Sequence, residues 1–571
     1  MTESTEPGPA ALPATTPAGR ARARALDGLS PLPEPMQWVE YHSSGRLLII
    51  GPADDAWPLA KVLAERMTCA ILATQPPAEP PESAPPARYL DGRPRELSGH
   101  LGAFTLKVEV DRGRVLDAAA AFGIESDTFD LVLDLDGSGG MRMDVAPPGY
   151  YRAVTDAERQ QALTELPDLI GEFQKPRYFD YKPEICAHGA SGITGCSNCL
   201  EVCATEAITS AGDRIEVDPY LCQGCGSCTT VCPSGAIRYQ APDRGELLTG
   251  AQRLLVDYRA AAGTETETVP APELLLYNAG SAAGGLARHA PELPEHVIPV
   301  PVEDVGAIGL ESWLSLLAFG AARVLLLPGP EPAPSLGAAS RSQLDVLDPL
   351  LRALGDAHAA ERVVWLSGPD AARRLQPLPA MVGEPAAFDG RGYKRVVARQ
   401  ALAALHAQAV LQGQPDETVA LPAGAPYGDI EVDRDACTLC MACVSICPAT
   451  AVQGGGELPR LLFREERCLQ CGLCAQACPE DAIGLRPRMH FAAHVRPGER
   501  VLNEAEMHHC PDCGKPFATR ALIDRMRERL SDHWMFATDQ ARERLLRCED
   551  CRIRNLWEQE GGFDLHKPGR D

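Results

Sequence analysis

Closely spaced cysteines constrain the fold of this 571-residue chain more than any other feature. All but Cys69 of its 21 cysteines fall into short, repeated spacings. Three segments have the full pattern C-x2-C-x2-C-x3-C followed by proline, and they begin at Cys222, Cys437 and Cys468. We see no secretory signal, and thiols clustered in this way inside cells bind metal more often than they form disulfides. The spacing therefore predicts segments that fold around metal-containing centres.

The cysteine segments also form a fourfold repeat. An Ala and then an Ile or Val follow, four and five residues later, after each of Cys203, Cys232, Cys447 and Cys478. In addition, the Ile-Glu-Val-Asp sequence at 215–218 before one motif recurs at 430–433 before another. We therefore expect two copies of one module, over residues 181–244 and 416–490, each internally doubled.

The three complete motifs resemble those of the bacterial two-cluster ferredoxins. In that family three closely spaced thiolates hold one cluster, and the fourth cysteine of the run reaches the neighbouring cluster. Zinc fits this spacing poorly, because four-cysteine zinc sites usually use two separated pairs. The resemblance implies α+β modules that carry [4Fe-4S] clusters. The implied ligand sets are Cys437, Cys440, Cys443 and Cys478; Cys468, Cys471, Cys474 and Cys447; and Cys222, Cys225, Cys228 and Cys203.

The remaining site is irregular, because Ile193 stands where the motif ending at Cys203 needs its first cysteine. Cys186 is the candidate replacement, and the glycines between it and Cys196 make the connecting loop flexible enough to fold back. A three-iron cluster and ligation by His188 stay open as alternatives. The assigned ligand set is Cys186, Cys196, Cys199 and Cys232.

Two C-x2-C pairs near the C-terminus, separated by 34 residues, predict a different kind of site. This arrangement is typical of tetrahedral, all-cysteine structural zinc, and we expect a zinc-ribbon-like domain over residues 491–571. Helical patterns cover residues 519–530 and 538–547. Rubredoxin-like iron is the main alternative, although Arg552 follows the second pair where that site would have glycine. The four ligands would be Cys510, Cys513, Cys548 and Cys551.

The rest of the chain predicts two α/β domains with parallel sheets, over residues 37–180 and 245–415. Strand patterns occur at 47–50, 70–72, 129–135, 274–277, 297–302, 324–327 and 363–366, and helical patterns at 54–67, 281–289, 308–320, 342–354 and 393–411. The run Gly280-Ser-Ala-Ala-Gly284-Gly285 lacks the dinucleotide-binding spacing, so we expect a turn there. Residues 1–36, rich in Pro and Ala, are expected to be a disordered tail.

Net charge and hydropathy exclude some classes of partner. The net charge of −24 argues against nucleic acid and against an anionic membrane surface. Glu311 and Arg323 interrupt the most apolar region, so no run is long enough for a membrane span. We therefore expect a soluble protein of the cytoplasm.

The combination of four cluster motifs, a four-cysteine tail and the segment from Phe179 to His188 resembles long bacterial 4Fe-4S ferredoxin-type proteins, or polyferredoxins. These often accompany molybdenum formate dehydrogenases. Residues 274–330 are similar to the delta-subunit domain of methyl-viologen-reducing hydrogenases, but they lack that family's cysteines, so no cluster is carried over.

These resemblances imply an electron carrier whose partner is a redox protein such as formate dehydrogenase. We see no general base, activated nucleophile or open metal position, so we expect no catalysis by the chain alone. A flavin-binding iron–sulfur oxidoreductase subunit and a metalloenzyme assembly factor are the alternatives. The sequence does not indicate the oligomeric state.

Overall fold

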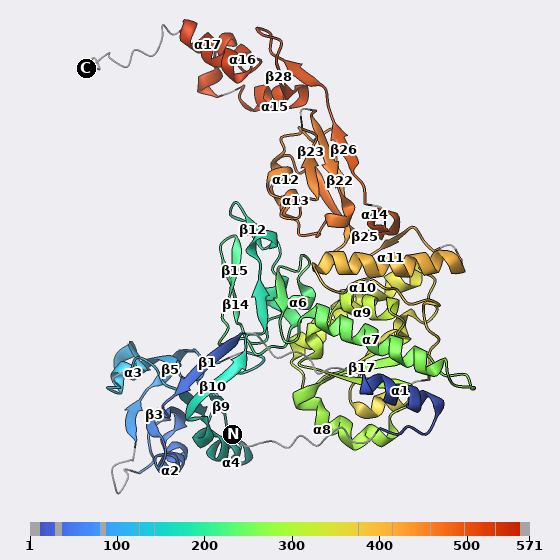
Figure 1. Cartoon of the computed structure of the whole chain (residues 1–571). Coiled ribbons are helices and arrows are strands. Elements are labelled where there is room, and N and C mark those ends of the chain that lie inside the picture. The colour runs from blue at the N-terminus through green and yellow to red at the C-terminus, as the bar shows by residue number, and fades with distance from the viewer. Residues whose placement is uncertain are drawn as a thin grey trace.

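The computed structural model describes residues 12–28, 37–79 and 87–559, apart from residues 125, 142, 375, 414, 457, 496 and 532. Figure 1 shows two α/β domains flanking the first module, with the second module stacked on the second α/β domain at helix α11 (Lys394–Gln412). The C-terminal four-cysteine domain lies beyond the second module, at the far end of the molecule (Figure 1).

The prediction of a disordered tail is wrong for part of the N-terminal segment. Helix α1 (Pro17–Asp27) packs against α7 (Arg244–Ala262), with Thr16 as its N-cap. Arg22 is 1% exposed and donates hydrogen bonds to the carbonyl oxygens of Pro294 and Val297. The buried alanines of this segment, Ala21 and Ala25, belong to the same apolar core as residues of α7. Residues 1–11 and 29–36 of the predicted tail lie outside the described residues.

The first α/β domain has a five-stranded parallel sheet in the order β4-β3-β2-β8-β9. Apolar clusters cover both faces of this sheet, as a parallel sheet requires. Two smaller antiparallel groupings, β1-β10 and β5-β6-β7, complete the domain. Its elements are β1 (Trp38–Ser43), β2 (Arg46–Pro52), α2 (Ala53–Leu63), β3 (Thr68–Gln75), β4 (Arg88–Asp91), β5 (Arg93–Ser98), β6 (Thr105–Val110), β7 (Arg114–Asp117), α3 (Ala118–Ala121), β8 (Leu131–Asp134), β9 (Tyr150–Arg152), α4 (Asp156–Glu165) and β10 (Gly171–Pro176).

The second α/β domain has a four-stranded parallel sheet in the order β18-β17-β19-β20. The predicted strands and helices are present. The expected turn at 280–285 instead lies inside α8, because alanines on both sides of the glycines favour helix. The long helix α7 had no counterpart in the predicted set. After α7 the elements are β17 (Glu273–Asn278), α8 (Ala279–His289), β18 (Val297–Val302), α9 (Leu310–Ala318), β19 (Arg323–Leu327), α10 (Pro334–Ala353), β20 (Val363–Trp365) and α11 (Lys394–Gln412).

The two modules share one topology. In each, a strand before the first cysteine motif pairs antiparallel with a strand after the last motif, as β11-β16 and β22-β25, and two strands between the motifs form a hairpin, β14-β15 and β23-β24. The first module contains β11 (Phe179–Tyr181), β12 (Gly189–Ala190), β13 (Ile193–Thr194), α5 (Asn198–Glu201), β14 (Ile208–Ala211), β15 (Arg214–Val217), α6 (Ser227–Val231) and β16 (Ile237–Tyr239). The second contains β21 (Thr418–Ala420), β22 (Gly428–Val432), α12 (Ala442–Ser445), β23 (Val452–Gly454), β24 (Arg460–Phe463), α13 (Leu473–Gln476), β25 (Ile483–His490) and α14 (Phe491–Val495).

The boundary after the second module differs from the expected one. Strand β26 (Arg500–Glu504) lies beyond residue 490 but pairs with β24, so it belongs to the sheet of the second module. The four-cysteine domain follows with β27 (Met507–His509), β28 (Pro516–Thr519), α15 (Arg520–Arg529), α16 (Asp539–Arg544) and α17 (Glu549–Gln559). Among the described residues, no helix combines the length and apolar character needed to cross a bilayer.

Candidate metal centres

The cysteines of the two modules lie in four groups of neighbouring thiols. In group A, Cys228 lies near the thiols of Cys225, Cys222 and Cys203, and Cys199 of the neighbouring group B is also close to it. In group B, Cys199 lies near the thiols of Cys232, Cys196 and Cys186. Group C, which lines one pocket, consists of Cys447, Cys468, Cys471 and Cys474. Group D lines another, and consists of Cys437, Cys440, Cys443 and Cys478. In every group, three cysteines come from one half of the module and one from the other half.

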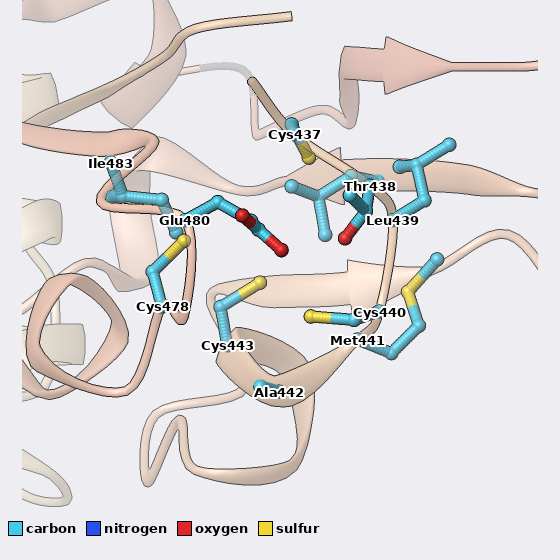
Figure 2. Close-up of a pocket in the computed structure, with 11 residues that line it drawn as sticks. Cys437, Thr438, Leu439, Cys440, Met441, Ala442, Cys443, Cys478, Glu480 and Ile483 are labelled. Carbon is cyan, nitrogen blue, oxygen red and sulfur yellow. The ribbon is translucent and has the colours of Figure 1, made fainter. Parts of the chain in front are cut away.

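Groups C and D surround hollows of nearly equal size, about 360 and 340 Å³. Figure 2 shows the sulfur atoms of Cys437, Cys440, Cys443 and Cys478 directed toward the interior of the group D hollow. Four soft thiolate ligands around one hollow suit an iron–sulfur cluster. The presence of one such four-cysteine pocket for each half of the module agrees with the internal doubling.

The backbone of each complete motif turns in the same unusual way. The residues two and four positions after the first cysteine have positive φ in all three motifs, although only some are glycine. They are Gly224 and Gly226 (φ 77° and 73°), Leu439 and Met441 (55° and 63°), and Gln470 and Gly472 (55° and 82°). Such left-handed residues turn successive N–H groups toward one concavity, which then favours negative charge. Three non-glycine residues in this strained conformation mark the loops as functional.

The repeated alanine has a structural role. The residue just before it has positive φ in all four copies, at Glu206, Gly235, Thr450 and Asp481. In the second module this turn lets Ala451 donate its N–H to Cys447 Sγ at 3.3 Å. Ala482 makes the same bond to Cys478 Sγ at 3.4 Å. The alanine thus supplies a hydrogen bond to the sulfur that belongs to the other group of the pair.

The irregular site in the first module is built by a hairpin that the spacing did not reveal. Strands β12 and β13 pair antiparallel, and Cys196 donates its N–H to the carbonyl of Ala187 at 2.8 Å. This bond returns the chain to the residue after Cys186, so Cys186 and Cys196 lie at the open end of one hairpin. The hairpin takes the place of the loop turns in the complete motifs.

His188 is buried, and both of its ring nitrogens have partners. Nδ1 lies 2.9 Å from the carbonyl oxygen of Cys196, and Nε2 lies 2.7 Å from Ser210 Oγ. Neither nitrogen points to group B as a ligand would. This arrangement indicates that His188 stabilises the β12-β13 hairpin, and it disfavours the alternative in which His188 is a cluster ligand.

The cysteines sit in surroundings that disfavour an isolated thiolate. Burial first, and neighbouring thiols second, raise the pKa of Cys443 to about 12. Burial likewise raises the pKa of Cys468 to about 11, while its hydrogen bonds with Gln470 oppose the shift. A bound cationic metal centre reverses this preference and stabilises the thiolate form. The donor set therefore fits a metal centre better than a set of reactive thiols.

The four cysteines near the C-terminus form a separate group. The sulfur atoms of Cys510, Cys513, Cys548 and Cys551 all lie within 4.8 Å of one another. The first pair sits at the β27-β28 hairpin, where Gly514 has φ 72°, and the second pair lies at the start of α17 rather than on a second hairpin. Burial acts to raise the pKa of Cys510, but N–H groups of Cys548, Cys513 and Asp512 outweigh it and lower the pKa. This group can hold one tetrahedral ion.

The four-cysteine domain contacts group D through residues that carried no signal in the cysteine spacing. Glu480 lines the group D pocket and is labelled in Figure 2. Arg529 of α15 pairs with Glu480 at 2.9 Å, and Arg525 approaches it at 3.7 Å. Thr519 also donates from Oγ1 to the carbonyl of Thr438 at 3.0 Å. Helix α15 therefore covers one side of group D.

Comparison with known proteins agrees with this geometry. Residues 436–483 and residues 194–236 each match a family described as a 4Fe-4S dicluster domain. The second match begins after Cys186, so it does not include that residue.

Among curated relatives, the chain is 33% identical over 85 residues to the ferredoxin-type protein NapF of Escherichia coli, covering 14% of this chain and 52% of NapF. It is 41% identical over 59 residues to the pyruvate synthase subunit PorD of Thermotoga maritima, covering 10% of this chain and 58% of PorD. It is 40% identical over 85 residues to hydrogenase-4 component A of E. coli, covering 15% of this chain and 38% of that protein. The chain thus spans about half the length, or less, of these relatives. Each module of this chain therefore contains a segment that matches a 4Fe-4S dicluster domain, and the curated relatives include ferredoxin-type proteins.

Proposed function

We propose that this chain is a cytoplasmic electron-transfer protein with four [4Fe-4S] clusters and one structural zinc, and that it serves a larger oxidoreductase as its redox partner. The observation that carries the proposal is the presence of four separate thiol groups, A to D, each with four cysteines drawn from both halves of a module. Each group would hold one cluster. Group B would use Cys186 in place of the cysteine that its motif lacks.

The residues around each group suit this role. The left-handed loops turn N–H groups toward the thiols, and the repeated alanines donate to sulfur. Hydrogen bonds of this kind stabilise negative charge on a cluster and so influence its reduction potential. An iron–sulfur cluster, when bound, supplies reversible one-electron chemistry.

The C-terminal group would hold zinc rather than iron. Its two C-x2-C pairs are far apart in sequence, and all four positions are filled by thiols, which is typical of closed structural sites. Arg552 follows the second pair. A closed site adds stability to a small domain and leaves no position for substrate.

A redox protein is the expected partner, and formate dehydrogenase is our first candidate because of the polyferredoxin resemblance. The names of PorD and hydrogenase-4 component A describe parts of larger oxidoreductases. The net charge of −24 favours a partner with a basic docking surface, so transfer should slow as salt rises.

Metal content tests the cofactor part of the proposal. Protein purified anaerobically should contain about sixteen irons, in four clusters, and about one zinc per chain. Paramagnetic resonance of the reduced protein should show cubane signals from both modules. Iron near eight per chain, with both modules folded, would refute the assignment of four clusters.

Electron transfer tests the functional part. The reduced protein should pass electrons to formate dehydrogenase but should not turn over formate, hydrogen or a pyridine nucleotide alone. Turnover by the isolated chain would overturn the carrier hypothesis. Tightly bound flavin would support the oxidoreductase-subunit alternative, and stable binding to a cofactor-free enzyme without electron transfer would support the assembly-factor alternative.

A further inference from the structure

The two modules touch at the edges of groups B and C. Gly195, next to Cys196 of group B, lies so close to Leu473 that a methyl group built on it would be 2.7 Å from Leu473 Cγ. Leu473 stands between Cys471 and Cys474 of group C and is fully buried. Strand β13 packs on α13 at this point, although about 280 residues separate them in sequence.

The contact brings groups B and C together. Cys196 directly follows Gly195, and Leu473 lies between Cys471 and Cys474. Cys196 belongs to group B, whereas Cys471 and Cys474 belong to group C in the other module. Among the groups on the two modules, B and C thus face each other across the contact.

The second α/β domain holds the modules in this relation through consecutive residues at the start of α11. Lys394 donates from Nζ to the carbonyl oxygens of Thr229 and Thr230 in the first module, at 2.9 and 2.5 Å. The next residue, Arg395, donates to the carbonyl oxygens of Glu466 and Cys468 in the second module, at 3.1 and 2.9 Å. We call this pair the α11 clamp. Because it joins both modules to one rigid helix, the contact between them has a fixed geometry.

We propose that the contact between Gly195 and Leu473 is the crossing point for electrons between the modules, so that A, B, C and D form one continuous path in that order. This inference rests on the proposed function, since it requires a cluster at each group. In the crossing step one electron leaves the site of group B, which is oxidised, and enters the site of group C, which is reduced, with no proton or bond transferred. A protein reductant at one end and a protein oxidant at the other complete the balance.

The order of the path can be tested with two matched variants of the full chain. Cys186→Ala removes a ligand of group B, and Cys222→Ala removes one of group A. Each should lose about a quarter of the iron, that is, one cluster of four. In the proposed order, group B is the neighbour of group C, and only Cys186→Ala empties group B. A cluster at B should broaden the paramagnetic resonance signals of the second module and make them relax faster. Only Cys186→Ala should lose this magnetic interaction. Equal effects of the two variants, or no effect of either, would overturn the proposed order.

Either cysteine replacement could cause the first module to lose both of its clusters. A second pair of variants therefore leaves all the cysteine ligands in place. Gly195→Leu places a side chain against Leu473 at the contact, and its Cβ also meets the carbonyl oxygen of Ala187 at 2.7 Å, so equal iron content is the check that group B stays intact. Gly484→Leu is its control, because Gly484 is exposed and a Cβ added there meets nothing within 4 Å. With iron content equal to wild type, the second-module relaxation should slow only in Gly195→Leu, and equal relaxation in both variants would overturn the path. Wild-type iron near eight would instead refute the four-cluster proposal, so the two failures are distinguishable.

Discussion

Replacement of Arg395 by methionine tests whether the α11 clamp orders the second module. The guanidinium of Arg395 donates to three backbone carbonyls, of Pro426 at 2.6 Å, Cys468 at 2.9 Å and Glu466 at 3.1 Å. It also stacks over the ring of Tyr427, with 4.4 Å between Cζ and the ring centroid. Methionine keeps much of the side-chain volume but donates no hydrogen bond.

The size of the effect follows from these contacts. A hydrogen bond from a charged donor contributes about 1.5–3 kcal/mol net, so three such bonds set an upper limit of about 5–9 kcal/mol. Two terms reduce this value. Burial lowers the pKa of Arg395, because it disfavours the charged form, and methionine has no such desolvation cost. Arg395 also keeps part of its surface exposed, which screens its charge. We expect a loss of about 3 kcal/mol in the local stability of the loop around Cys468.

Amide hydrogen exchange on the cluster-loaded protein measures this local stability. A loss of about 3 kcal/mol corresponds to exchange about 100-fold faster at the amides of residues 465–470. Arg399→Met is the matched control, because it makes the same change one turn further along α11. Unchanged exchange at 465–470, or the same acceleration in Arg399→Met, would refute the clamp.

Three other predictions address single sites. Cys548→Ser should release the zinc and unfold residues 505–559, because three of the four cysteines form the centre of that small core with Phe517, while the iron content stays constant; limited proteolysis and metal analysis check this. Glu480→Gln should raise the midpoint potential of the group D cluster, because it removes a negative charge that lines the pocket; a redox titration followed by paramagnetic resonance checks it, with the exposed Glu431→Gln as control. His188→Ala should keep about sixteen irons, because both ring nitrogens bond to the hairpin and to Ser210; loss of one cluster would favour ligation.

The sequence was most informative where short-range spacing determines structure. The cysteine runs predicted two modules. The fourfold Cys-x3-Ala repeat corresponds to a turn in which the residue before the alanine is left-handed in every copy. Alternating strand and helix patterns predicted a parallel sheet in the second α/β domain, because buried parallel strands are short, continuous apolar runs. The order of its strands, β18-β17-β19-β20, was not predicted. The ligand sets stay proposals, although the four thiol groups have the composition that the ferredoxin resemblance implies.

Other features depend on contacts that no local pattern contains. Leu439, Met441 and Gln470 have positive φ, which residue propensities do not predict and which only the surrounding loop enforces. The segment of α1, which composition predicts to be disordered, is helical because α7 provides a surface for its alanines. Nothing in the sequence around Lys394 and Arg395 indicates that they bind two different modules.

The position of the second α/β domain between the modules has a physical consequence. A flexible linker of comparable length would let the modules sample many separations, and electron transfer between them would then depend on chance encounters. The inserted domain instead holds both modules through one helix. Lys394 and Arg395 are consecutive residues of α11, and each binds a different module, so the helix fixes the distance between the two modules. If this domain only joined the modules, weakening the clamp would leave the interaction between groups B and C unchanged. If it sets their separation, Arg395→Met should weaken the magnetic interaction between groups B and C without any loss of iron. This outcome would show that the hydrogen bonds of one arginine influence electron transfer between the two modules.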